Sequence, residues 1–163
     1  MREIYLVNVA LHVVAALVWV GGMLFLALVG APVLRKVEPA ALRSELFREL
    51  GERFRAVGWV CIAVLLVTGL FNLAFRGLLD ASTLASAAFW RSPYGAALAW
   101  KLGGVTLMVV LSAVHDFVHG PRASRLHAGS PEAARARRRA AVLARLNAVL
   151  GLLVVLAAVR LPR

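Results

Sequence analysis

Four apolar runs dominate this chain, and they decide what it can fold into. They cover roughly residues 4–29, 57–75, 96–118 and 141–159. A helix needs about 20 residues to cross the hydrocarbon core of a membrane, and each run is close to that length or longer. Backbone groups inside lipid must be paired within the protein, which leaves helices as the structure for such runs. With 61% hydrophobic residues, the sequence predicts a single all-α domain over residues 1–163, an integral membrane four-helix transmembrane bundle.

The basic residues are unevenly distributed, and their placement predicts the orientation of the bundle. The formal net charge is +11. Two connections hold most of the basic side chains, Arg35, Lys36, Arg43, Arg48, Arg53 and Arg55 in the first and Arg122, Arg125, Arg135, Arg137, Arg138 and Arg139 in the third. Cytoplasmic loops are enriched in Lys and Arg, so both connections are predicted to face the cytoplasm and both termini the outside. We interpret the arginine run as a topology signal that contacts lipid headgroups, and not as a nucleic-acid site.

The connections also contain local helix signals. Apolar residues recur every four positions from Leu42 to Phe54, which predicts an amphipathic helix at the inner membrane interface over roughly residues 39–54. Serine followed by proline is typical of a helix start, and Gly-Pro of a helix end. These pairs are Ser92-Pro93 and Ser130-Pro131 at the predicted starts of the third and fourth helices, and Gly120-Pro121 at the predicted end of the third.

Polar and sulfur-bearing residues gather on one stripe of each of the first three helices. Spacings of three and four residues place them on a common helical face. The stripes contain Asn8, His12, Trp19 and Met23 on the first helix, Cys61, Thr68 and Asn72 on the second, and Lys101, Met108, Ser112, His115 and His119 on the third. Polar groups in membrane helices usually face the bundle interior, so the stripes predict one polar seam. The alternative is that the small polar residues only hold the helices together.

The seam contains side chains that bind soft metal ions. Thioether, thiolate and imidazole together favour cuprous copper over magnesium or calcium. The predicted ligands are His12 in the outer half of the membrane, Met108 near the middle, and Met23, Cys61, His115 and His119 towards the inner side. His12 and His115 differ by roughly 20 Å in depth at the rise of an α-helix, so they are not expected to hold one haem between them. For each sulfur-bearing residue the alternative is ordinary core packing.

Other kinds of chemistry have no support in the sequence. The single cysteine excludes an intrachain disulfide, and no phosphate-loop, Gly-x-Ser-x-Gly or zincin motif is present. No catalytic residue is assigned. Asp116 lies about 100° round the helix from His115, so it is predicted to cap the arginine-rich loop or to pair with Arg145.

Four segments resemble the membrane domain of the copper-resistance protein D (CopD) family, namely LHVVAALVWVGGML, GWVCIAVLLVTGLFNL, SPYGAALAWKLGGVTLMVVLSAVHDF and RLNAVLGLLVVLAAV. The most specific pieces are Thr68-Gly69-Leu70 followed by Asn72, and Tyr94-Gly95 followed by Lys101-Leu102. The resemblance implies copper transport or homeostasis at the bacterial cytoplasmic (inner) membrane. It also implies a periplasmic copper-binding protein as a partner, beside membrane lipids and further copies of the chain.

A more distant resemblance links the chain to the HemJ-type protoporphyrinogen oxidases. It rests on His12, Trp19, Lys101, Leu102, Arg145 and Asn147. It implies haem b, bound near His12, Trp19 and Lys101, and quinone-linked oxidation of a porphyrinogen. Arg145 and Asn147 join Asn8 and Asn72 as further members of the polar seam. Copper is the main prediction and haem the alternative, because the two glycines after Trp19 favour the CopD pattern.

Overall fold

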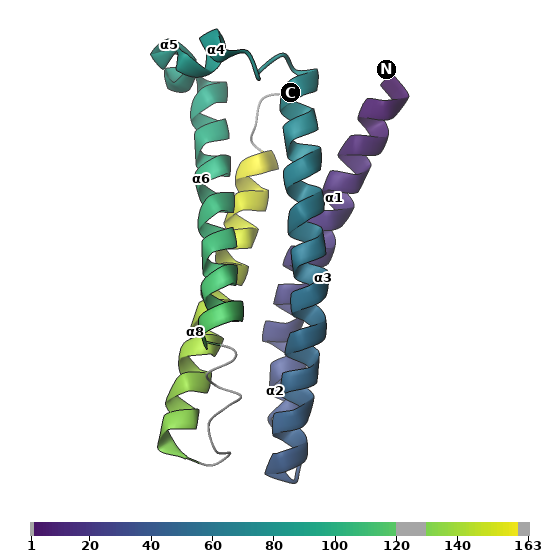
Figure 1. Ribbon diagram of the computed structural model, residues 1–163, viewed down its shortest axis with the longest axis vertical. Coiled ribbons are helices and arrows are strands. Elements are labelled where there is room, and N and C mark those ends of the chain that lie inside the picture. The colour runs from purple at the N-terminus through teal and green to yellow at the C-terminus, as the bar shows by residue number, and fades with distance from the viewer. Residues whose placement is uncertain (1, 120–129, 160–163) are drawn as a thin grey trace.

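Four long helices form a bundle in the computed structural model, which describes residues 2–119 and 130–159 (Figure 1). Each contains a segment long and apolar enough to cross a membrane. No strand occurs in these two described ranges. The predicted all-α multi-pass membrane bundle is therefore confirmed. The predictions for Gly120-Pro121, Arg122 and Arg125 fall outside the described residues.

The first two crossings occupy residues 2–75. The first combines α1 (Arg2–Phe25), the π-helical turn η1 (Leu26–Gly30) and α2 (Ala31–Leu34). The second is α3 (Ala40–Phe75), which begins directly after Pro39. α3 contains both the predicted amphipathic helix of roughly residues 39–54 and the second membrane helix, and the first runs into the second without a break, as the sequence predicted. At about 1.5 Å per residue this helix is far longer than the hydrocarbon core, so it extends several turns beyond it.

The second half of the chain supplies the other two crossings. Two short helices, α4 (Ala81–Ala85) and α5 (Ala87–Arg91), lead to α6 (Pro93–Val114), which continues into a second π-helical turn, η2 (His115–His119). The fourth crossing is α8 (Pro131–Val159). α1 begins and α8 ends at the same end of the bundle as α4 and α5 (Figure 1).

Local hydrogen bonds explain where the helices begin and end. The Ser92 hydroxyl accepts a hydrogen bond from the Gly95 N–H at 3.0 Å, which confirms the predicted start of α6. α3 ends at Phe75, and Gly77, two residues beyond, has a φ of +68° that is readily adopted only by glycine. Asp80 begins α4, and hydrogen bonds from the Ser82 hydroxyl and from the Thr83 N–H lower the pKa of its carboxyl group.

The bundle consists of two helix pairs. α1 packs along α3, α6 packs along α8, and contacts between α1 and α8 join the pairs. Small residues permit this approach. A Cβ atom on Gly151 of α8 would lie 2.9 Å from the Met108 methyl group and 3.3 Å from Val20. Both π-helical turns also contact α8. α8 therefore holds the N-terminal pair and the C-terminal pair together.

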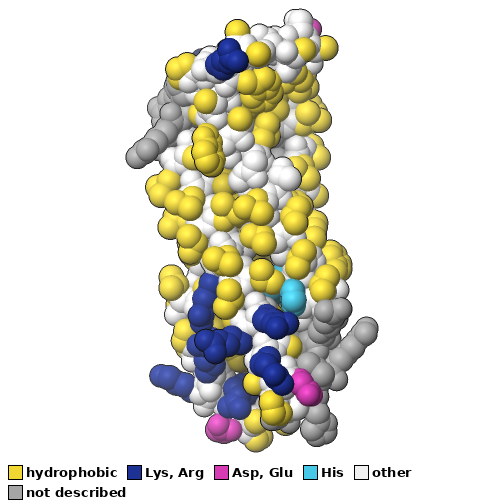
Figure 2. Space-filling model, turned by 90° about the vertical axis from the view of Figure 1, so that its left-hand side faces the viewer, with side chains coloured by type: hydrophobic (Ala, Val, Ile, Leu, Met, Phe, Trp, Pro, Cys, Tyr) yellow, Lys and Arg dark blue, Asp and Glu magenta, His cyan; other side chains and the backbone are white. Residues whose placement is uncertain are grey.

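Apolar and basic side chains occupy different levels along the long axis of the bundle. Figure 2 shows an apolar band around most of one face and Lys and Arg side chains gathered at the lower end. That end carries the start of α3 and the start of α8, which hold most of the basic residues. The two basic connections therefore lie at the same end of the bundle, away from α4 and α5.

Candidate functional site

A polar cluster joins α1 to α3 near the end where α1 begins. The Asn8 side-chain amide donates hydrogen bonds to the Asn72 Oδ1 atom at 2.9 Å and to the Thr68 carbonyl oxygen at 3.1 Å. The His12 Nδ1 atom lies 2.7 Å from the Thr68 hydroxyl. Thr68 is buried, with 5% of its surface exposed. Two of the predicted stripes thus face each other, and their regular spacing matches across the antiparallel helices.

The hydrogen-bond network assigns the tautomer of His12. The Thr68 hydroxyl donates to the Val64 carbonyl oxygen at 2.6 Å, so its single proton is already used. It must therefore accept from His12, which places the imidazole proton on Nδ1. The Nε2 atom then carries a lone pair. Neutral imidazole with a free Nε2 atom is the form of histidine that binds a metal ion.

Positive charge surrounds His12. Lys101 on α6 is half-buried, and its ammonium group lies near the His12 imidazole and near the Arg76 guanidinium, whose charge repels it. None of the ion pairs among the described residues involves Lys101 or Arg76. The Arg76 guanidinium lies over the Tyr94 ring, 5.7 Å from its centroid. Burial opposes the charge of Arg76, but the hydroxyl groups of Tyr5 and Tyr94 raise its pKa. This end of the seam is cationic.

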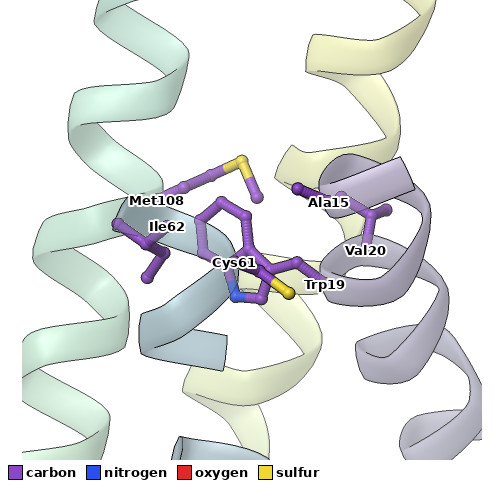
Figure 3. Packing of buried hydrophobic residues seen from close by; sticks show 6 residues of the cluster. All are labelled: Ala15, Trp19, Val20, Cys61, Ile62 and Met108. Atoms are coloured by element: carbon purple, nitrogen blue, oxygen red, sulfur yellow. The ribbon is translucent and has the colours of Figure 1, made fainter. Parts of the chain in front are cut away.

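The centre of the bundle is a tightly packed cluster that contains two of the predicted sulfur ligands. Figure 3 shows the Trp19 ring, which extends from α1, with Cys61 and Met108 beside it. Trp19 is 4% exposed and Met108 is 1% exposed. Met23 packs against the same cluster. The sequence placed Met108 at the middle and the other two sulfurs deeper, whereas the structure brings all three to one cluster.

α8 contributes a buried amide next to this cluster. The Asn147 Nδ2 atom donates to the Ser112 hydroxyl at 2.8 Å and approaches the Met23 sulfur at 3.5 Å. Asn147 is 5% exposed, and its Oδ1 atom has no hydrogen-bond partner in the described part of the chain. Arg145, the other predicted seam residue of α8, is exposed. Asn147 therefore joins the seam and Arg145 lies outside it.

Asp116 organises the end of the seam at η2. Its carboxylate accepts a hydrogen bond from the Trp59 indole N–H at 3.0 Å and lies 2.9 Å from the His115 Nδ1 atom. An Arg55 side chain also reaches its carbonyl oxygen, at 3.5 Å. The predicted pair with Arg145 is not found among the described residues. Trp59 has no place in the predicted stripes, because it lies two residues before Cys61 and therefore on another face of the helix.

The Asp116 carboxylate also determines which ring nitrogen of a neutral His115 carries the proton. A carboxylate only accepts hydrogen bonds, so the Nδ1 atom of a neutral His115 must carry the proton. Its Nε2 atom then has a free lone pair, as in the carboxylate–histidine arrangements that orient metal ligands. His115 lies outside the central sulfur cluster, and His119 lies on a groove beside α8. Within residues 2–119 and 130–159, no three His, Cys, Asp or Glu residues are grouped so that they could hold a metal ion.

Comparison with known proteins agrees with the membrane fold and adds a family. Residues 48–161 match the family model described as Copper resistance protein D. The chain is 38% identical over 124 residues to a protein of Aquifex aeolicus (strain VF5) described as an uncharacterized protein, which corresponds to 76% of this chain and 73% of that relative. No solved structure matches the chain.

Proposed function

Because the chain belongs to the copper resistance protein D family, we propose that it binds cuprous copper within its helix bundle and handles it at the bacterial cytoplasmic membrane. Copper is the cargo in this proposal, and the protein is a carrier or a store and not a catalyst. The family match supports a role in copper resistance, and the four apolar helices support a multi-pass membrane protein.

The central sulfur cluster is the observation that carries the proposal. Cys61 and Met108 belong to the buried cluster around Trp19, and Met23 packs against that cluster. Thioether and thiolate ligands select cuprous copper over harder cations, so the donor set fits this ion. The face of the Trp19 ring attracts a cation in a water-free site. Each of these side chains is also suited to simple packing, and the two roles are separated by the titration below.

Two histidines flank the cluster along the seam. His12 and His115 each have the Nε2 atom free, because Thr68 and Asp116 occupy the Nδ1 atoms. We place His12 at the outer level and His115, with His119, at the inner level of the copper path. Lys101 and Arg76 repel a bare cation at the outer level. This favours delivery by a partner that shields the ion with its own ligands, such as a periplasmic copper-binding protein.

The sulfur cluster is tested by competition with a chromophoric cuprous chelator. Met108→Leu nearly conserves side-chain volume but removes the thioether. We expect its affinity for cuprous copper to fall at least about tenfold, which corresponds to about 1.4 kcal/mol. Ile62→Val serves as the control, because Ile62 belongs to the same cluster and carries no ligand atom. Unchanged affinity in Met108→Leu, with both variants folded, would remove the central site from the proposal.

Haem remains the alternative cargo or cofactor, and His12 is the residue that favours it. The free Nε2 atom of His12 suits an axial ligand as well as a copper ligand. The other described histidines, His115 and His119, both lie on η2 at the opposite end of the bundle. A second axial histidine facing His12 is thus missing from the described residues. The visible spectrum of the purified protein decides, since a Soret band that His12→Ala abolishes would favour haem.

The orientation of the bundle is a separate prediction. The two basic connections should face the cytoplasm, because Lys and Arg are retained on that side. A cysteine introduced at Arg137, in a Cys61→Ser background, should react in intact cells only with thiol reagents that cross membranes. A cysteine at Ser82, between α3 and α6, should react with impermeant reagents as well. The reverse labelling pattern would invert the outer and inner levels assigned above.

A further inference from the structure

A groove lies at the basic end of the bundle, between η2 and the first turns of α8. Its volume is about 490 Å³, and its described lining consists of His119, Arg135, Arg138, Arg139, Val142 and Leu143. The groove is thus lined both by arginines and by two apolar side chains. Figure 2 shows this height of the molecule, where basic side chains border the apolar band.

The three arginines of the groove have no acidic partner among the described residues. The arginine ion pairs found there belong to Arg43, Arg48 and Arg53 of α3. Glu132 is the acidic residue nearest in sequence on α8, and it forms none of these pairs. The groove therefore concentrates positive charge that no described residue neutralises through an ion pair.

Guanidinium groups and apolar side chains in one groove select a particular class of ligand. Arginine binds phosphate through paired N–H donors that match the geometry of its oxygens. Val142 is 46% exposed, and Leu146 one turn further is 55% exposed, so the floor of the groove continues into the lipid-facing surface of α8. A nucleic acid or a free anion would gain nothing from that floor, whereas an acyl chain would lie along it.

We propose that this groove is a binding site for an anionic phospholipid, with its phosphate held by Arg135, Arg138 and Arg139 and an acyl chain packed on Val142 and Leu143. The inference does not depend on copper. A lipid bound here would rest on α8, which joins the two helix pairs, and would add to the contacts that hold the bundle together.

The test compares two arginines that are adjacent in the sequence. Arg138 lines the groove and Arg137 does not, and both are exposed on α8. Purified protein in neutral detergent is titrated with phosphatidylglycerol, and bound lipid is counted by native mass spectrometry. We expect Arg138→Gln to weaken phosphatidylglycerol binding about fivefold to tenfold, as for the loss of one ordinary hydrogen bond. Arg137→Gln should stay within about twofold of the wild type, because diffuse attraction alone is weak.

Three further measurements test whether the groove binds the phosphate and the acyl chain of one lipid. Phosphatidylcholine should bind far more weakly than phosphatidylglycerol, and inorganic phosphate should not compete at equal concentration. Leu143→Asn should weaken phosphatidylglycerol binding without any change in charge. Equal losses in Arg137→Gln and Arg138→Gln, equal binding of both lipids, or full competition by inorganic phosphate would each overturn the site. If Arg138→Gln does not fold, Arg138→Lys replaces it, since lysine keeps the charge and loses the paired donors.

Discussion

Replacing Trp19 with alanine is expected to lower the free energy of unfolding by about 3–5 kcal/mol, the range found for the loss of a buried aromatic side chain. Trp19 is 4% exposed. Its ring packs against Gly58 of α3, where an added Cβ atom would lie 3.6 Å from the Trp19 Nε1 atom. Lipid is as apolar as the core, so the loss is one of packing contacts and not of water exclusion. Unfolding of the purified protein in mixed micelles, followed by helical circular dichroism, measures it.

Trp100 provides the matched control. It lies on α6 and is 80% exposed, so Trp100→Ala removes the same side chain from the lipid-facing surface. We expect a change within about 0.5 kcal/mol, as for most surface substitutions. Similar losses in the two variants would mean that Trp19 is not the centre of the packing.

Asp116→Ala should have the second largest effect, a loss of about 1–3 kcal/mol of unfolding free energy. The substitution removes the acceptor of the Trp59 indole and the partner of His115 together. The bond to Trp59 joins α3 to η2, which belong to different helix pairs. Glu49→Ala is the control, because Glu49 is 47% exposed and pairs with Arg53 within α3. An exposed pair of this kind contributes less than about 1 kcal/mol.

A double-mutant cycle separates the hydrogen bond from other effects of the substitution. Trp59→Phe removes the indole N–H and keeps an aromatic ring, and Asp116→Leu removes the carboxylate. Because Trp59 and Asp116 share one hydrogen bond, the losses of unfolding free energy from the two substitutions should not add. The interaction energy should be about 0.5–3 kcal/mol. Strictly additive losses would show that Trp59 and Asp116 stabilise the bundle independently.

The sequence was most informative where a pattern repeats. The length of the apolar runs predicted four membrane helices, and Ser92 with Pro93 predicted the start of α6. The polar stripes predicted one polar seam, and in the structure the stripes of α1 and α3 meet, since Asn8 and His12 are one turn apart and so are Thr68 and Asn72. A residue spacing that two helices share can be recognised even when the predicted ends of the helices are wrong by several residues.

The sequence was least informative about depth and pairing. The midpoint of each apolar run was the reference for every predicted depth, and the run of residues 57–75 covers only part of α3, which begins at Ala40. That is why Cys61 and Met108 were assigned to different levels and lie in one cluster. The bond between Trp59 and Asp116 was missed, because it depends on which helices are adjacent and no periodicity encodes that. Asn147 was included among the predicted seam residues only because of the resemblance to the HemJ-type oxidases, since α8 has no polar stripe of its own.

The division into two helix pairs also bears on how the protein is made. α1 and α3 are consecutive, so the ribosome releases both before α6 exists, and the hydrogen bonds of Asn8 and His12 can form at that stage. The contacts of Met23 with Asn147 and of Trp59 with Asp116 must wait for the second pair. Substitutions at these later contacts should therefore weaken the docking of two correctly inserted helix pairs and leave the insertion of each pair unchanged. Substitutions in the first pair should act earlier, while the chain is still attached to the translocation machinery.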